Sequence, residues 1–336
     1  MSNFSFVSIF TVIVLIYFQS SAHADITYTD IERPQPLSLI DSLPLYHESP
    51  LQPSGLSVCQ NRLLMVSDNQ NSSIYELHPS NKEHPLSLFQ KIIVSPPPLP
   101  SSLPWKEGIK TRLSMLFSSK TYDWEAITCD NNGNIYLASE AFFNIAKIDS
   151  SGCAHWQMNN LYQDGAKKGF FSVYNGGVEG LAWQGKNSLY IAAERSKRGL
   201  IKAQYSSNKW EVTGTHLVPD SEFSNYPQRS QDLSGLWQEG GYLFTLERNN
   251  FLICRRNLNK LSVETCWSYS HVENSPEFLY RDTHFGIAEG LARLENRLYI
   301  VVDNNEKARI SNSATNTKNT HALLMVYKLP ENWLPD

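Results

Sequence analysis

Short apolar runs alternate with polar turns along most of the chain, at a spacing typical of β-hairpins. The stretch DWEAITCDNNGNIYLASE, at residues 123–140, shows the pattern, because two apolar segments flank a polar turn at 130–133. An acid stands near each open end of this hairpin, Glu125 where the first segment begins and Glu140 where the second finishes. The pattern predicts two core-forming strands that carry carboxylates at the same end.

This hairpin pattern occurs five times in the chain. Each copy opens on a small or acidic residue, continues with a Gly-Leu-like step, a polar turn and a β-branched or aromatic strand, and ends on Asp or Glu. The copies are SGLSVCQNRLLMVSD (54–68), EAITCDNNGNIYLASE (125–140), EGLAWQGKNSLYIAAE (179–194), SGLWQEGGYLFTLE (234–247) and EGLARLENRLYIVVD (289–303). A third strand is expected after each copy, at 73–77, 144–149, 199–204, 251–256 and 322–329. The copies start 71, 54, 55 and 55 residues apart.

A period near 55 residues with several strands per unit predicts an all-β protein that forms a single β-propeller. Five blades account for the chain from 54 to 329, and six blades are the alternative. The last unit supplies only three strands. We expect a strand from the N-terminal stretch 25–40 to complete that blade, because closing the ring removes an exposed sheet edge. The propeller domain would then span 25–336.

The first step between copies is longer than the others by 16 residues (71 − 55). The extra length falls in the proline-rich stretch SPPPLPSSLPWKEGIKTRLSMLF, at residues 95–117. Ile109, Leu113 and Leu116 stand there at helical spacing, which indicates one short helix. We interpret 95–122 as an insertion between the first and second blades.

The N-terminal 24 residues have the pattern of a secretory signal peptide. The apolar run at 6–18 has 13 residues, too few to span a bilayer, which takes about 20. A small-x-small site follows at 22–24, although no Lys or Arg precedes the apolar run. We expect cleavage rather than an uncleaved anchor. The mature chain would be periplasmic or secreted, with no remaining membrane span.

Five cysteines fit an oxidising compartment only in part, because one of them must stay unpaired. Cys254 and Cys266 lie six residues on either side of Lys260, near the centre of a predicted hairpin turn. They would therefore face each other across the two strands, at a distance that a disulfide can bridge. Two packed thiols are the alternative, and the sequence does not pair the other three cysteines.

Composition and motifs exclude several function classes. The chain is 41% hydrophobic with a net charge of −4, which argues against a nucleic-acid partner. The sequence contains no G-x-S-x-G, H-E-x-x-H, C-x-x-C or P-loop motif. We expect a monomer whose partner is an anionic small molecule or, alternatively, a protein or glycan.

The repeated acids would meet at one mouth of the central channel. In a propeller blade the first strand lines the channel and the second runs back, so the start of one and the end of the other share a face. The first-strand acids are Glu125, Glu179 and Glu289, and the second-strand acids are Asp68, Glu140, Glu194, Glu247 and Asp303. Ser54 and Ser234 take the first-strand position in the other two blades.

Carboxylates this close raise one another's pKa unless a cation neutralises them. Calcium binds six to eight oxygen atoms, and a site with few His or Cys residues favours it over zinc. We expect calcium, with the three first-strand glutamates as its main ligands. The alternative is that the acid-arginine pairs Glu194-Arg195 and Glu247-Arg248 make salt bridges from blade to blade.

Basic residues are expected around the same mouth, on the loops that enter the first strands and leave the second. Arg195 and Arg248 could bind an anionic, phosphate-bearing ligand. His284 could act as a general acid or base, although a single histidine also fits a purely structural role.

The repeated motifs resemble those of the phytase-like, esterase-like family of secreted bacterial β-propellers. The similarity rests on DWEAITCDNNGNIYLASE, GGVEGLAWQGKNSLYIAAER, DLSGLWQEGGYLFTLERNN and GIAEGLARLENRLYIVVDNN. It implies a propeller with calcium in or near the channel, and hydrolysis of phosphoesters or other esters. Carried over position by position, it covers the first-strand glutamates and the second-strand acids. Serine at two first-strand positions departs from that pattern.

Three functions remain open on the sequence. The first is a calcium-dependent hydrolase of phosphate or other esters. The second is a non-catalytic propeller with a structural calcium, which binds a protein or glycan partner. The third is a lactonase-like propeller, which the dominance of glutamate over asparagine and aspartate disfavours.

Overall fold

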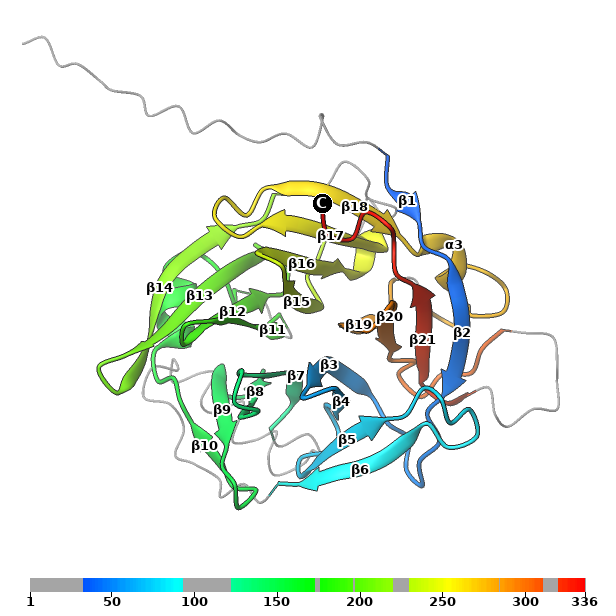
Figure 1. The fold of residues 1–336 in the computed structure, drawn as a ribbon, viewed down its shortest axis with the longest axis horizontal. Coiled ribbons are helices and arrows are strands. Elements are labelled where there is room, and N and C mark those ends of the chain that lie inside the picture. Colours follow the sequence, from blue (N-terminus) through cyan, green and yellow to red (C-terminus); the bar gives the residue numbers. More distant parts are fainter. Residues whose placement is uncertain are drawn as a thin grey trace, which may run out of the picture.

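The computed structural model describes residues 33–92, 122–172, 176–195, 197–219, 230–283, 285–310 and 320–335. Within them, the strands form five sheets that stand around a central axis (Figure 1). The predicted five-bladed, all-β propeller is confirmed. The predicted signal peptide and the predicted helix at 109–116 lie outside the described residues.

Each blade is an antiparallel meander whose strands follow one another outward from the axis. Blade one contains β3 (Pro53–Cys59), β4 (Arg62–Ser67), β5 (Ser73–Leu77) and β6 (Leu86–Lys91). Blade two contains β7 (Trp124–Cys129), β8 (Ile135–Ser139), β9 (Asn144–Ile148) and β10 (Ala154–Trp156). Blade three contains β11 (Val178–Gly185), β12 (Ser188–Ala193), β13 (Gly199–Ser206) and β14 (Lys209–Leu217).

Blade four contains β15 (Gly235–Glu239), β16 (Tyr242–Glu247), β17 (Leu252–Asn257) and β18 (Val263–Ser268). Blade five contains β19 (Ala288–Leu294), β20 (Arg297–Val302), β21 (Leu323–Lys328) and β2 (Leu39–Pro44). Short helices connect some of the strands: α2 (Leu161–Ala166), η2 (Arg248–Asn250) and α3 (Ser270–Glu273). None of the helices in the described part of the chain is long and apolar enough to cross a membrane.

The N-terminal segment joins the ring through blades four and five. Strand β2 pairs antiparallel with β21, so it is the outermost strand of blade five (Figure 1). It begins at Leu39, so it overlaps only the end of the stretch 25–40 from which a closing strand was predicted. The preceding pair β1 (Gln35–Pro36) runs parallel to β18 and adds a fifth strand to blade four.

The five first strands β3, β7, β11, β15 and β19 lie against one another around the axis. Glycine near the start of four of these strands allows the close approach, and β7 has the small residue Ala126 there. A Cβ at Gly55 would lie 2.7 Å from the Cα of Ala126, and a Cβ at Gly290 would lie 2.7 Å from the backbone nitrogen of Leu56. The repeated Gly-Leu step therefore follows from backbone-to-backbone packing at the axis.

Apolar side chains fill the space between neighbouring blades. Between blades one and two, Leu64 and Val66 of β4 pack with Ile127 of β7 and Leu137 of β8, all almost fully buried. Clusters of the same kind separate the other blades. These layers fix the blades relative to one another, so the loops at each mouth are held on a rigid scaffold.

Two disulfides are present. Cys254 and Cys266 are directly opposite each other on β17 and β18 and form the predicted bond, with a Cα–Cα distance of 4.1 Å. Cys59 and Cys129 form a second disulfide between the ends of β3 and β7, which the sequence did not predict. Cys153 is a free thiol. The second bond joins two different blades, so it depends on how the blades pack.

Candidate functional site

Four of the five first strands begin with a β-bulge. In blade three, Val178 pairs with Ala193 and Gly180 pairs with Ala192, so Glu179 is an extra residue between them. The other bulges occur at the equivalent positions Ser54, Glu125 and Glu289. A bulge bends its strand and redirects the side chain of the extra residue. Each first-strand acid therefore lies at a bulge. The regular pairing of the two strands does not fix the direction of its side chain there.

The second-strand acids are held beside these bulges by a repeated backbone hydrogen bond. The N–H of Glu140 donates to the carbonyl oxygen of Asp123 at 3.0 Å, and the N–H of Glu194 donates to that of Gly177 at 3.1 Å. Asp68 and Asp303 donate to the corresponding carbonyls. In each blade the acceptor lies two residues before the bulged position. The backbone thus brings the first-strand and second-strand acids to the same end of the channel, which we call the acid mouth.

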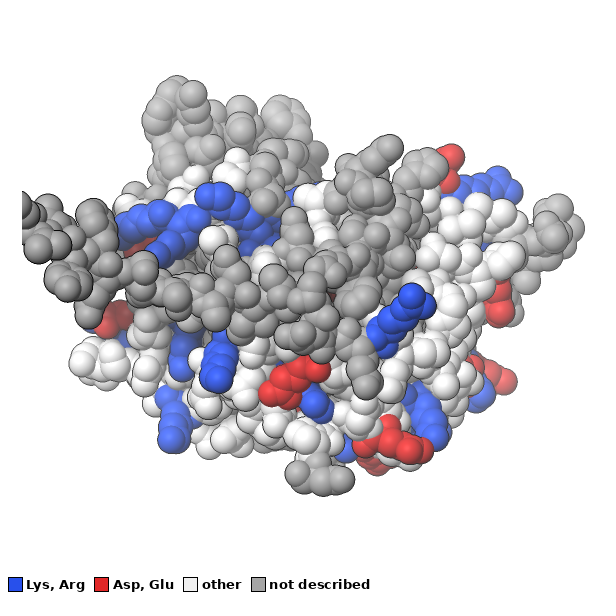
Figure 2. Space-filling model, turned by 90° about the horizontal axis from the view of Figure 1, so that it is seen from above, with Lys and Arg blue, Asp and Glu red and all other residues white. Residues whose placement is uncertain are grey.

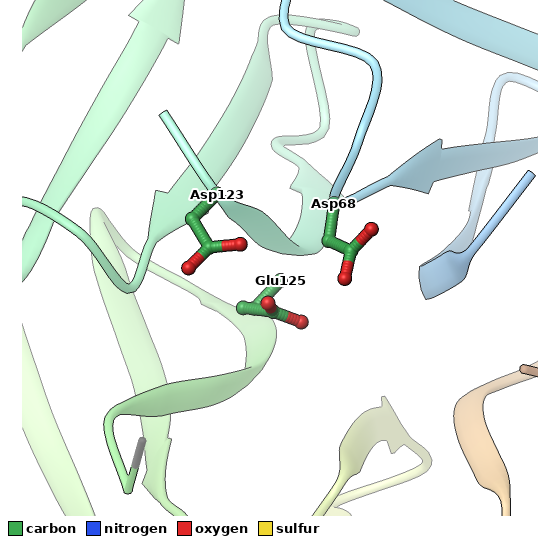
Figure 3. Close-up of side chains that lie close together, drawn as sticks. All are labelled: Asp68, Asp123 and Glu125. Atoms are coloured by element: carbon green, nitrogen blue, oxygen red, sulfur yellow. The ribbon is translucent and has the colours of Figure 1, made fainter. Parts of the chain in front are cut away.

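Two groups of three carboxylates converge at the acid mouth. In each group, one oxygen from every member lies within 4.8 Å of the others; the groups are Asp68, Asp123 and Glu125, and Glu140, Glu179 and Glu194. Figure 3 shows that the side chains of the first group come from two blades and point toward a common space. Glu125 and Glu140 are 9% and 8% exposed, and Glu179 is 5% exposed. We call Asp68, Asp123, Glu125, Glu140 and Glu179 the acid cluster.

Burial and mutual repulsion dominate the electrostatics of the acid cluster. Burial raises the pKa of Glu125 well above its usual value, and the charges of the neighbouring carboxylates raise it further. Burial likewise raises the pKa of Glu140 to about 8, against partial opposition from Arg195. The pKa of Glu179 is also well above its usual value, first because of burial and then because of Glu194. By itself Glu140 would hold its proton at neutral pH.

The opposite side of the acid mouth contains a buried arginine. Arg248, the first residue of η2, contacts three carboxylates from blades three, four and five. Its Nη2 lies 2.6 Å from Glu194 Oε1, its Nε lies 2.8 Å from Asp232 Oδ2, and its Nη1 donates to Glu289 Oε1. Burial would lower the pKa of Arg248, but these carboxylates raise it well above the ordinary value. We call these four residues the arginine cluster.

Glu194 belongs to both sides of the mouth. It lies within the second carboxylate group and also accepts from Arg248 and Arg195. Arg195 Nε donates to Glu194 Oε2 at 2.7 Å, and its side chain is 33% exposed. Glu194 thus pairs with the adjacent Arg195 and also, from blade to blade, with Arg248, a salt bridge of the kind that the sequence offered as the alternative.

Glu247 has a different setting from the other acids. Its Oε2 accepts from Arg198 at 2.8 Å and its Oε1 accepts from Arg256 at 2.8 Å, while Asn250 donates to Oε2 at 3.0 Å. Burial would raise the pKa of Glu247, but the two arginines hold it at about 2. Its contact with Arg198 joins blades four and three, which is a blade-to-blade salt bridge of the kind that the sequence offered as the alternative to a metal site. We therefore leave Glu247 out of the candidate metal site.

The remaining predicted residues lie in neither cluster or cannot be placed. Asp303 Oδ1 accepts the N–H of Asn305 at 2.8 Å and takes part in neither carboxylate group. His284 lies outside the described residues. Basic and acidic side chains are intermingled on the edge of the disc that Figure 2 shows.

Sequence reasoning missed Asp123 and Asp232. Both stand two residues before the first-strand position of their blade, in YDWEA and QDLSG. Asp123 enters the acid cluster, and Asp232 accepts from Arg248 and from the N–H of Asn249. An alignment of the five repeats extended by two residues would have placed the two aspartates at one structural position.

The fold and the acid mouth define the class of this protein as a five-bladed β-propeller with carboxylates buried at one end of its channel. The sequence matches the family model described as "Phytase-like: Esterase-like activity of phytase" over residues 52–306. The chain belongs to this family, as the repeated motifs predicted. No curated protein matches the chain in sequence.

Solved structures with a similar fold include several enzymes. Glutaminyl cyclase of Myxococcus xanthus has a TM-score of 0.52 and 9% identity, covering 89% of this chain and 100% of that one. A luciferin-regenerating enzyme has a TM-score of 0.46 and 11% identity, covering 86% and 96%. A gluconolactonase of Xanthomonas campestris has a TM-score of 0.43 and 9% identity, covering 89% and 99%. At 9% identity, the similarity to glutaminyl cyclase shows a shared fold alone.

Proposed function

We propose that the acid cluster binds calcium and that the protein is a calcium-dependent hydrolase of anionic esters, acting at the acid mouth. The observation that carries the proposal is the convergence of two groups of carboxylates in a buried space. Buried carboxylates this close must either take up protons or share a cation. Secretion to a calcium-rich compartment is consistent with the two disulfides.

The residues of the acid cluster fit calcium. All five offer carboxylate oxygens, and Glu140 Oε1 is a buried oxygen without a hydrogen-bond partner among the described residues. Oxygen-only sites favour a hard cation, and calcium tolerates irregular coordination better than magnesium does. When bound, such a cation polarises an ester and lowers the pKa of water at the site.

Arg195 is the residue we assign to the substrate anion. Its side chain is partly exposed and is held in place through Glu194, whereas Arg248 is 10% exposed and contacts three carboxylates. A guanidinium fixed by a carboxylate on one side can present its other N–H groups to a phosphate or carboxylate. Arg248 then has a structural role, because its contacts connect blades three, four and five.

The first test measures metal and turnover on the same purified protein. We expect metal analysis after dialysis against calcium to show bound calcium. We also expect phosphomonoester or aryl-ester hydrolysis that stops in chelator and returns with calcium. Glu179→Gln should lose both properties, while the exposed-surface control Glu331→Gln should keep them.

Two results would separate the alternatives. Bound calcium without hydrolysis in either ester screen would support the non-catalytic propeller with a structural ion. If the protein bound no calcium, and chelator did not lower its melting temperature, the shared-ion proposal would be wrong.

A further inference from the structure

The first strands end at the opposite mouth of the channel, which we call the far mouth. A pocket of about 300 Å³ opens there, lined by the ends of β3, β7, β11 and β15. That volume is many times what one water molecule needs and lies at the lower end of the range for small-molecule sites. The pocket is therefore large enough for a small ligand.

The lining of the far mouth is polar but uncharged. It includes the hydroxyls of Ser57 and Thr128, the amides of Asn131, Gln184 and Gln238, and two tryptophans, and no Asp, Glu, Lys, Arg or His is among the described lining residues. An ion in such a pocket would lose its hydration without gaining an opposite charge. The lining therefore favours a neutral ligand, in contrast to the acid mouth.

Two buried polar atoms of the lining residues lack a partner among the described residues. They are the indole Nε1 of Trp183 and the amide Oε1 of Gln184, a donor and an acceptor on adjacent residues of β11. Leaving such atoms unpaired in a folded protein is unfavourable, so they commonly bind a ligand or ordered water.

Trp183 and its neighbours are held in position. The indole of Trp183 stacks on Tyr136 with a centroid distance of 5.5 Å, and its backbone N–H donates to Thr128 Oγ1 at 3.2 Å. Trp237 donates its own indole N–H to Glu239, so this group is already in use. The donor of Trp183 is thus fixed by packing rather than free to rotate toward another partner.

We infer that the far mouth is a second ligand site, which binds a neutral polyhydroxyl ligand of the size of one monosaccharide unit. Indole rings and amide and hydroxyl side chains together provide both apolar contact and hydrogen bonds for such a ligand. The site does not depend on the acid mouth, because none of its lining residues belongs to the acid cluster or the arginine cluster.

Calorimetry and saturation-transfer NMR on the full chain, with glucose, mannose and N-acetylglucosamine as probes, test the inference. We expect at least one of these sugars to bind with a millimolar dissociation constant. Trp183→Phe keeps the ring and removes the N–H, and Gln184→Ala removes the acceptor. Each should weaken binding about five- to tenfold, the effect of one hydrogen bond.

Matched controls separate this site from the acid mouth. Gln204→Ala changes an exposed amide on β13 of the same blade and should leave sugar binding unchanged. Glu179→Gln and chelator should also leave it unchanged, even though both should abolish calcium binding. If Trp183→Phe or Gln184→Ala melts at a lower temperature than the original chain, Gln238→Ala tests the pocket from β15 instead.

Three outcomes would overturn the inference. If none of the neutral sugars bound, the pocket would contain only solvent. The site would lie elsewhere if all three pocket variants bound sugar as the original chain does. The ligand class would be wrong if glucuronate or glucose phosphate bound more tightly than glucose and lost that binding in Gln184→Ala.

Discussion

The acid cluster and the arginine cluster occupy the same positions of the repeat but neutralise buried charge in different ways. In the arginine cluster, Arg248 contacts Glu194, Asp232 and Glu289 directly. In the acid cluster, every neighbouring charge that shifts the pKa of Glu125 raises it. The repeat therefore fixes the positions of the acids, while the neighbouring loops decide whether an arginine of the chain contacts them.

The largest effect should come from removing the internal cation. Arg248→Met keeps an apolar side chain but leaves three buried carboxylates without their shared partner. Breaking a buried ion pair in this way costs about 3–5 kcal/mol in the free energy of unfolding. Denaturant unfolding followed by circular dichroism measures the loss. Arg195→Met is the matched control, and equal losses in the two variants would contradict a special role for Arg248.

A glutamate-to-glutamine change should have opposite effects in the two clusters when calcium is removed. Glu179→Gln should stabilise the chelated protein, because burial raises the pKa of Glu179 and glutamine needs no proton to be neutral. Glu289→Gln should destabilise it by about 1–3 kcal/mol, because Arg248 loses a carboxylate that it contacts directly, and this loss outweighs the relief of the burial that raises the pKa of Glu289. Unfolding in chelator measures both values, and a loss of the same size in both variants would remove the distinction between the clusters.

The pH dependence of stability should reveal the acid cluster. The pKa of Glu140 is raised from 4.5 to about 8, so the folded chain holds this proton more tightly than the unfolded chain does. Its contribution to stability is therefore complete below pH 4.5 and is lost as the pH rises through about 8. In chelator we expect the melting temperature to fall over this interval.

Calcium should reverse this fall, since a cation favours the ionised carboxylates. The rise in melting temperature on adding calcium should grow from pH 5 to pH 8, within the interval set by Glu140. Glu140→Gln should flatten the curve measured in chelator. A melting temperature that rose with pH in chelator would mean that another group dominates the acid mouth.

The smallest effect on stability should come from Arg195. Because its side chain is 33% exposed and its only ion pair among the described residues is with Glu194, Arg195→Gln should change the free energy of unfolding by less than about 1 kcal/mol. If Arg195 binds the substrate anion, the same variant should raise KM for a phosphomonoester. Steady-state kinetics with calcium present measures this, and an unchanged KM would exclude Arg195 from substrate binding.

Much of the fold could be predicted because the hairpin repeat is local. Each copy combines strand alternation, a turn and a Gly-Leu step within about 15 residues, and these features act on neighbouring parts of the chain. The Cys254–Cys266 disulfide was predictable for the same reason, since the register of one hairpin determines it. Cys59–Cys129 was not, because its cysteines are 70 residues apart in different blades.

The sequence by itself determined the blade repeat, the disulfide between Cys254 and Cys266, and the positions of the repeated acids. Only the tertiary structure decided that Arg248 contacts Asp232 and acids of two neighbouring blades, while Glu247 is neutralised by Arg198 and Arg256. A repeat places a residue within its own blade. Contacts between blades depend on how far a side chain reaches across the packed interface, which the spacing of residues along the chain does not encode.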